Sequence, residues 1–121
     1  SANTRLSASS GGNKTQAGYA AIGANMDAAS LIHLKAGDTL RIKGVSLPAA
    51  NDGNSVAAAY SATATLVSTG YIYNGHTWNN LSFASSGDIV TITATGEHYI
   101  RVSLTCTDAS AVIATINEEI S

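Results

Sequence analysis

The chain is poor in several residue types on which common kinds of protein chemistry depend. Among its 121 residues there are one cysteine, one proline and one tryptophan, and only 12% of the residues are charged. The single Cys106 excludes a disulfide within the chain and leaves the cellular compartment open. Six Lys and Arg residues stand against eight Asp and Glu residues, and the cations are scattered along the sequence. Because binding to nucleic-acid phosphates requires clustered cations, we expect no nucleic-acid partner.

Long apolar runs are also missing. No run reaches the roughly 18 residues of a membrane-spanning helix, so we expect no membrane insertion. Ala, Ser, Thr, Asn and Gly fill the sequence instead. Thr suits a pleated surface, and Gly and Asn suit turns, so this composition favours strands and turns. The length is typical of a single domain over residues 1–121, of which we expect residues 1–4 to be flexible.

Period-two alternation is the clearest structural signal. In "HYIRVSLTC", the apolar residues Ile100, Val102, Leu104 and Cys106 share one face, and the polar residues between them share the other, as in a half-buried strand. Further strands are predicted at residues 31–34, 38–45, 55–60, 66–67, 88–96 and 111–120. Short strands at this spacing, with turn residues between them, predict an all-β fold, an antiparallel β-sandwich of the jelly-roll-like kind.

The N-terminal part is harder to assign. Residues 7–15 and 48–55 are predicted to be loops, because they are rich in Ser, Gly, Asn and Pro. In "QAGYAAIGANMDAAS", Tyr19, Ile22 and Met26 have helical spacing. Gly18 and Gly23 oppose a helix, because each costs about 1 kcal/mol in a helix interior. A helix and a non-helical structure both stay open for residues 16–30, and we favour the second.

The acidic residues give little indication of catalysis. Glu118 and Glu119 are adjacent, and on a strand their side chains would point to opposite faces. They would then be unable to flank one glycosidic bond. Cys106 falls on the apolar face of its predicted strand, which indicates an inert core thiol. We therefore expect no enzymatic activity and no cofactor.

Metal ligation is not indicated either. His33, His76 and His98 lack the close spacing of zinc ligands. The "NDGN" loop at residues 51–54 offers oxygen ligands for calcium, but the further acid of an EF-hand loop is missing. A weak calcium site at residues 51–54 stays an alternative to a plain loop.

The segment "YIYNGHTWNN" is the strongest candidate for a binding site. A sugar site needs an aromatic platform with amides beside it, and this segment has that composition. If it forms a strand, the two tyrosines share a face, the Asn-Gly pair makes a hairpin turn, and the tryptophan lies just beyond the turn. The candidate ligand-binding residues are Tyr71, Tyr73, Asn74, His76, Trp78, Asn79 and Asn80. The alternative is that Trp78 and one tyrosine cap the core of the sandwich.

Three segments together resemble a module of tail-associated proteins from bacteriophages and prophages. They are "TRLSASSGGNKTQAGYAAIGANMDA", "IHLKAGDTLRIKGV" and "GDIVTITATGEHYIRVSLTCTDASAVIATINEEI". The chain departs from that pattern at "LTCTDASAVIAT", where bulky apolar residues are partly replaced by Ala. The resemblance implies a compact β-sandwich in a tail fibre or baseplate protein, and so a location in the virion or on an extracellular surface.

This resemblance also suggests partners. It implies attachment to a host-surface glycan by a non-catalytic module, and assembly with further copies of the chain, as a homotrimer. The predicted outer strand faces carry uncharged residues, namely Thr91, Thr93, Ser103 and Thr105. Such faces either pack against a neighbouring copy or are solvated. A purely structural, oligomerising domain is therefore the alternative to a carbohydrate-binding one.

Overall fold

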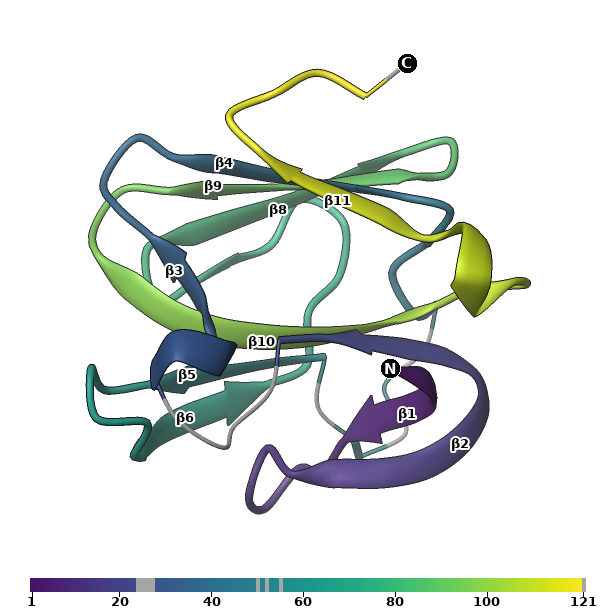
Figure 1. Ribbon diagram of the computed structural model, residues 1–121, viewed down its shortest axis with the longest axis horizontal. Helices are drawn as coiled ribbons and strands as arrows, with labels where there is room; N and C mark the ends of the chain where they lie inside the picture. The colour runs from purple at the N-terminus through teal and green to yellow at the C-terminus, as the bar shows by residue number, and fades with distance from the viewer. Residues whose placement is uncertain (24–27, 50, 52, 55, 121) are drawn as a thin grey trace.

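Two antiparallel sheets packed face to face make up the computed structural model (Figure 1). It describes residues 1–23, 28–49, 51, 53–54 and 56–120. The predicted antiparallel β-sandwich is confirmed. The helices in the described ranges are two short 3-10 turns, η1 (Ala28–Ser30) and η2 (Ala109–Ala111). Neither they nor any other described segment forms a helix of the length and hydropathy needed to cross a membrane.

Sheet A contains the most enclosed strand of the molecule. From one edge to the other it consists of β1 (Ala2–Leu6), β2 (Asn13–Ile22), β10 (His98–Thr105), β5 (Ala57–Tyr60) and β6 (Leu66–Gly70). β2 pairs with residues 102–105 of β10, and the short β3 (Ile32–Leu34) pairs with residues 98–100 on the same side. Because β5 pairs with its other side, β10 is hydrogen-bonded along both edges.

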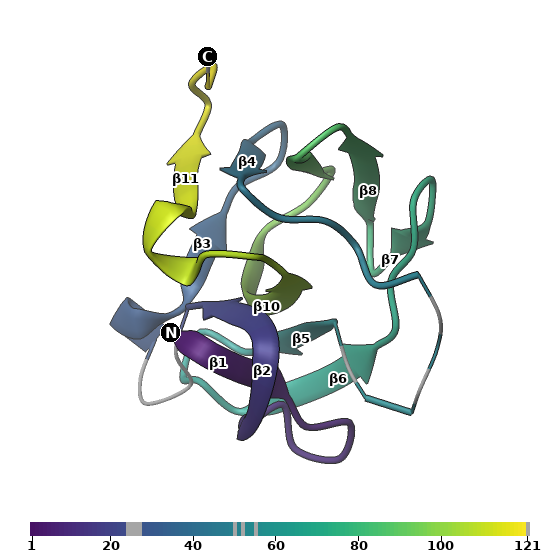
Figure 2. The same ribbon diagram turned by 90° about the vertical axis from the view of Figure 1, so that its right-hand side faces the viewer.

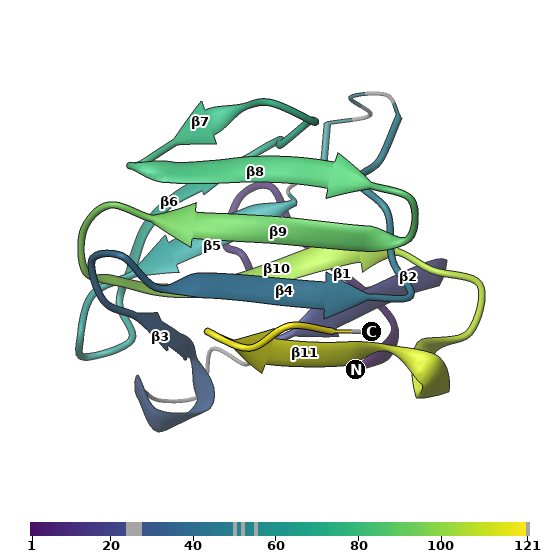
Figure 3. The same cartoon turned by 90° about the horizontal axis from the view of Figure 1, so that it is seen from above.

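Sheet B is seen face-on in Figure 3. Its order is β11 (Ile113–Ile116), β4 (Thr39–Lys43), β9 (Ile89–Ala94), β8 (Leu81–Ser86) and β7 (Thr77–Trp78). The chain crosses from one sheet to the other after β3, β4, β6, β9 and β10. These crossings make the sandwich jelly-roll-like, because strands that are neighbours in sequence often lie in opposite layers.

The main core lies between the two sheets and follows from the alternation of their strands. β4 and β9 bury every second residue, Leu40 and Ile42 on one strand and Val90 and Ile92 on the other. Ile100 faces them from β10 and is fully buried. Each such side chain contributes about 1.5–3 kcal/mol when it leaves water.

A second core lies on the outer face of sheet A, and it overturns one sequence prediction. β10 was expected to be half-buried, but Arg101 and Ser103 on its polar face are 1% and 0% exposed. The reason is that β2 bends. The β1–β2 hairpin therefore lies beneath the rest of sheet A, on the side away from sheet B (Figures 1 and 2). The Leu6 N–H donates to Ser103 Oγ at 3.1 Å, and Arg101 Nη1 donates to the Gly11 carbonyl at 2.8 Å. Ser103 is therefore not part of an exposed face.

The N-terminal segment forms part of sheet A. Residues 1–4, expected to be flexible, lie in or next to β1, and the Ser1 amine donates to the carbonyl of Ala21. The loop predicted over residues 7–15 is shorter, because β2 already begins at Asn13. The described part of the ambiguous segment continues β2 and is not helical. Met26 lies outside the described residues.

Candidate functional site

The segment that contains the predicted sugar-binding residues connects the two sheets. β6 ends at Gly70, and the next strand, β7, contains only Thr77 and Trp78. Tyr71 and Tyr73 therefore lie in a connection and not on a strand, contrary to the prediction. A turn is present at Asn74-Gly75, closed by the His76 N–H, which donates to the Tyr73 carbonyl at 3.0 Å, but it is not the predicted hairpin, because β6 and β7 lie in different sheets. Gly75 has φ of +82°, a conformation that glycine adopts without steric cost.

Trp78 faces the interior. It pairs across the hairpin with Leu81, which is fully buried, and paired residues of antiparallel strands point to the same face. Its indole packs on Gly70 of the opposite sheet so closely that a Cβ at residue 70 would lie 2.6 Å from Trp78 Nε1. Trp78 thus closes one side of the sandwich, as the core-cap alternative predicted, and does not take part in an exposed platform.

Asn79 and Asn80 form the tight turn between β7 and β8. Both residues have positive φ, 51° and 59°, the pattern of a type I′ hairpin turn, in which Asn is strongly preferred. The Asn79 Nδ2 donates to Ser68 Oγ at 2.7 Å, and the Asn80 carbonyl accepts from the Thr95 N–H and hydroxyl, both at 3.0 Å. Backbone geometry is sufficient to explain the two asparagines.

The remaining predicted residues come together as an aromatic patch, which we define as Tyr71, Tyr73 and His76 with Asn74 beside them. The rings of Tyr71 and Tyr73 have centroids 6.4 Å apart, and those of Tyr73 and His76 are 4.3 Å apart. Tyr73 is 51% exposed, whereas Tyr71 is half-buried. Asn74 is exposed and its Oδ1 accepts from the Ser85 N–H at 2.7 Å, which ties the patch to β8.

The patch and the Asn79–Asn80 turn lie at opposite ends of β8. Asn74 bonds to Ser85, whereas Asn80 immediately precedes Leu81. At about 3.3 Å per strand residue, the two positions along β8 are roughly 13 Å apart. The seven predicted residues therefore form two separate groups and one inward-facing tryptophan.

A pocket of about 290 Å³ adjoins the asparagine turn. Glu97 and His98 line it together with Asn79, Asn80 and the exposed Val67. Sequence reasoning missed Glu97, in the β9–β10 loop, and His98, the first residue of β10, as lining residues, although Gly96 directly before them was a turn signal. The His98 Nε2 is buried and has no partner among the described residues. Burial lowers the pKa of the His98 imidazole below its ordinary value.

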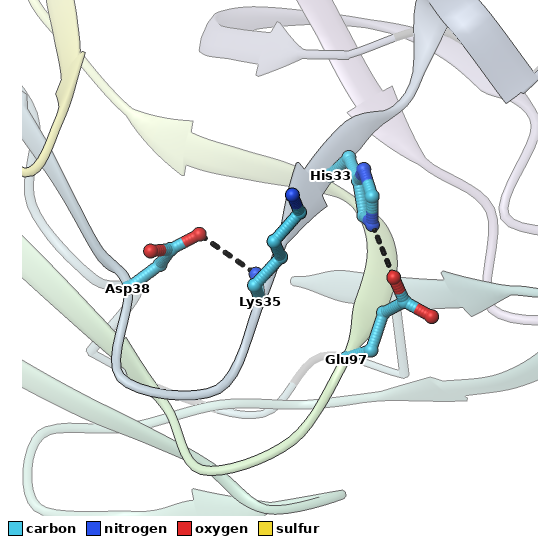
Figure 4. Close-up of polar contacts among 4 residues, drawn as sticks. All are labelled: His33, Lys35, Asp38 and Glu97. Atoms are coloured by element: carbon cyan, nitrogen blue, oxygen red, sulfur yellow. Dashed lines mark hydrogen bonds and ion pairs between the residues drawn. The ribbon is translucent and has the colours of Figure 1, made fainter.

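Polar contacts near this pocket fix the neighbouring loops (Figure 4). The Nε2 of His33 lies 2.8 Å from a Glu97 carboxylate oxygen, and the His33 ring stacks on Tyr99 with centroids 4.2 Å apart. Asp38 closes the β3–β4 turn by accepting the Lys35 N–H at 2.7 Å. Hydrogen bonds from Asn117 and from this N–H lower the Asp38 pKa. These contacts give Asp38 a turn-forming role.

The other residues considered for chemistry are dispersed. Cys106 lies just beyond β10 and is half-buried against the main core. Glu118 and Glu119 follow the end of β11 and so do not lie on a strand. In the ranges that the structure describes, no three His, Cys, Asp or Glu side chains are placed to hold a metal ion. The calcium loop considered at residues 51–54 includes Asp52, which lies outside the described residues.

Comparison with protein-family models, with curated proteins and with solved structures found no match to this chain. The site is therefore interpreted from its own geometry.

Proposed function

We propose that this chain is a non-catalytic carbohydrate-binding module, and that it binds sugar at the aromatic patch. One observation supports this most directly. Tyr73 presents an exposed ring next to His76, and the amide of Asn74 lies beside them. An exposed ring packs on the C–H face of a sugar, and an amide bonds its hydroxyls.

The patch offers binding groups but no hydrolytic ones. Glycoside hydrolysis uses a pair of carboxylates across the scissile bond, and the four patch residues include none. The proposed biological setting, a virion tail, rests on the sequence resemblance to phage tail modules. In that setting the ligand is a glycan of the host cell surface, and the chain is part of a virion tail appendage.

A glycan array of bacterial surface polysaccharides, followed by calorimetric titration, tests the proposal. We expect Tyr73→Ala to weaken binding about tenfold or more, roughly 1.4 kcal/mol. Val67→Ala is the matched control, because Val67 is also exposed but lies outside the patch. Unchanged affinity in the Tyr73 variant, or no binding by the wild-type chain on the array, contradicts the proposal.

A structural, self-associating module is the second candidate, and β11 favours it. β11 is an edge strand of sheet B, and its Ile113 and Ile116 are 53% and 43% exposed. Beside it lies an open groove of about 560 Å³. Its lining is mostly small and apolar, and includes Ala2, Ala20, Ala21, Ile22, Val112 and Ala114. Exposed apolar side chains on a free strand edge are typical of association surfaces.

Light scattering after size-exclusion chromatography distinguishes the two candidates. If copies associate through β11, the chain runs as a homotrimer or other oligomer, and Ile113→Lys converts it to a monomer. Val67→Lys places the same charge on a different edge strand and leaves the oligomer intact. A monomer at high concentration argues against self-association.

A further inference from the structure

The outer face of sheet B carries a third hollow, which is lined by none of the predicted ligand-binding residues. It has a volume of about 260 Å³ and lies between the sheet surface and the C-terminal segment that follows β11. We call it the strap groove. Its lining includes Arg41, Ala84, Ser86, Thr91 and Glu119.

The floor of the groove is set by strand register. Arg41 pairs with Thr91, and Thr91 pairs with Ala84, so these residues form one row across β4, β9 and β8. Ile89 and Ser86 pair in the next row. Paired residues share a face, and the small side chains of Thr91 and Ala84 leave a trough across the strands, with Ile89 beside it. With strands about 4.8 Å apart, the trough extends roughly 10 Å from β4 to β8.

The C-terminal segment forms a fixed wall of the groove. Asn117 turns the chain back with φ of 61°, its Oδ1 accepts from the Thr39 N–H at 2.9 Å, and its Nδ2 donates to Asp38 at 2.9 Å. The Glu118 carbonyl then accepts from Arg41 Nη1 at 3.1 Å and from the Thr115 hydroxyl at 3.0 Å. These bonds place Glu119 above the sheet.

Two oppositely charged side chains line this groove without pairing. Arg41 makes its one hydrogen bond with the Glu118 carbonyl, and Glu119 has no bonding partner among the described residues. The Thr91 and Ser86 hydroxyls likewise form no side-chain hydrogen bond within the described part. A guanidinium donates and a carboxylate accepts, so together they match the adjacent hydroxyl groups of a sugar ring, each of which does both.

One end of the groove leads to the aromatic patch. Ser85 lines the groove, and its N–H donates to Asn74 Oδ1 at 2.7 Å. The turn that carries the patch borders this edge of β8 directly, because the Gly75 N–H donates to the Phe83 carbonyl at 2.8 Å and the Phe83 N–H donates to the His76 carbonyl at 2.9 Å. The groove and the patch are therefore neighbours on the two sides of Ser85.

We infer that the strap groove binds a short oligosaccharide, with Arg41 donating and Glu119 accepting hydrogen bonds at neighbouring hydroxyls of one sugar. The oligosaccharide crosses Thr91 and Ala84 towards Asn74. This inference rests on the proposed carbohydrate-binding function and adds to it a second contact surface and the residues that select for hydroxyl groups.

Nitrogen-15 NMR titration of the whole chain tests it, with maltohexaose, cellohexaose, chitotetraose and xylohexaose as probes. We expect at least one probe to shift the amide signals of Ala84 and Thr91. Glu119→Gln and Arg41→Gln should each weaken that binding about tenfold. Glu118→Gln is the matched control and should leave the affinity unchanged, because Glu118 does not line the groove and its backbone carbonyl, which bonds Arg41, is the same in the variant.

The outcomes separate the two proposals. Shifts confined to Tyr73 and Asn74, with unchanged affinity in the Glu119 variant, contradict sugar binding in the groove and agree with binding at the aromatic patch alone. If groove amides shift and Tyr73→Ala does not change those shifts, sugar binding at the patch is contradicted and binding in the groove is supported. Shifts caused by free glycine, a zwitterion, but by none of the four saccharides overturn the sugar assignment in the groove. No shift with any probe overturns the inference about the groove, and the glycan array decides the aromatic patch separately.

Discussion

Gly70 and Trp78 pack tightly against each other where the two sheets meet at the β6–β7 edge. A methyl group at residue 70 would lie 2.6–3.1 Å from three indole atoms, so the ring and the strand would have to separate. We expect Gly70→Ala to lower the free energy of unfolding by about 1–3 kcal/mol, as in other overpacked cores. Urea unfolding measures the loss.

Gly96→Ala is the control for that experiment. Its nearest atom would be His98 Nε2 at 3.8 Å, an ordinary contact, and its φ is not in the left-handed region. It should change stability by less than about 0.5 kcal/mol. Equal stabilities for the two alanine variants would contradict the close packing of Trp78 on Gly70.

His98 should make the free energy of unfolding depend on pH. Its pKa is lowered by burial from the ordinary value of 6.5, so the unfolded chain takes up a proton at higher pH than the folded chain does. Stability is therefore unaffected well above that value and falls as the pH is lowered through it, until the folded imidazole is also protonated. Urea unfolding between about pH 7.5 and 5 should show this fall.

The His98→Gln variant should lose that part of the pH dependence, whatever its absolute stability. His76→Gln, which removes an imidazole from the aromatic patch, should keep the wild-type slope. A His98→Gln chain with an unchanged slope would show that another group is responsible.

At the scale of elements, a buried arginine attaches the β1–β2 hairpin to sheet A. Arg101 donates to the Gly11 carbonyl at 2.8 Å and to Asn13 Oδ1 at 2.5 Å, and burial lowers its pKa. Arg101→Met keeps most of the volume but leaves the Gly11 carbonyl with one donor fewer. We expect a loss of about 2–4 kcal/mol, with early exchange of the amides of β1.

Arg41→Met is the comparison for that loss. Arg41 is half-buried and donates one hydrogen bond to an exposed segment, so its replacement should cost less than about 1 kcal/mol. If both variants are equally stable, the guanidinium of Arg101 is not what holds the hairpin.

The β7–β8 hairpin depends on residues that tolerate positive φ. Asn80 has φ of 59°, a conformation that costs an alanine about 1–2 kcal/mol. Asn80→Ala should be destabilised by about that amount, and Asn80→Gly should be close to neutral, since Asn-Gly suits the same turn. Thermal unfolding of the two variants measures the difference, and equal melting temperatures would contradict the turn assignment.

For the whole molecule, the sequence predicted the strands that have one buried and one solvated face. β4 and β9 alternate strictly, and both lie where the pattern put them. β8 was missed because Ala and Ser fill its outer positions, which leaves Leu81 and Phe83 as its only strong apolar signal. The solvent exposure predicted for Arg101 was wrong because the hairpin that covers it is about 90 residues away in sequence.

The candidate site was predictable in composition and not in arrangement. The aromatic turn at Asn74-Gly75 was recognised from local signals. The inward direction of Trp78 is set by its pairing with Leu81 of β8, and local patterning did not reveal that strand. Arg41 and Glu119 meet through strand register and the left-handed turn at Asn117, so no spacing in the sequence indicates that they share a groove.

The covering of sheet A by the first hairpin has a consequence for the order of folding. The Leu6 N–H donates to Ser103, 97 residues later in the chain, so β1 completes its contacts only after β10 has formed. Loop closure over such a separation is slow, and the apolar side of the hairpin stays accessible to chaperones until β10 is formed. Pulsed hydrogen exchange during refolding should therefore show protection of the β4 and β9 amides before those of β1.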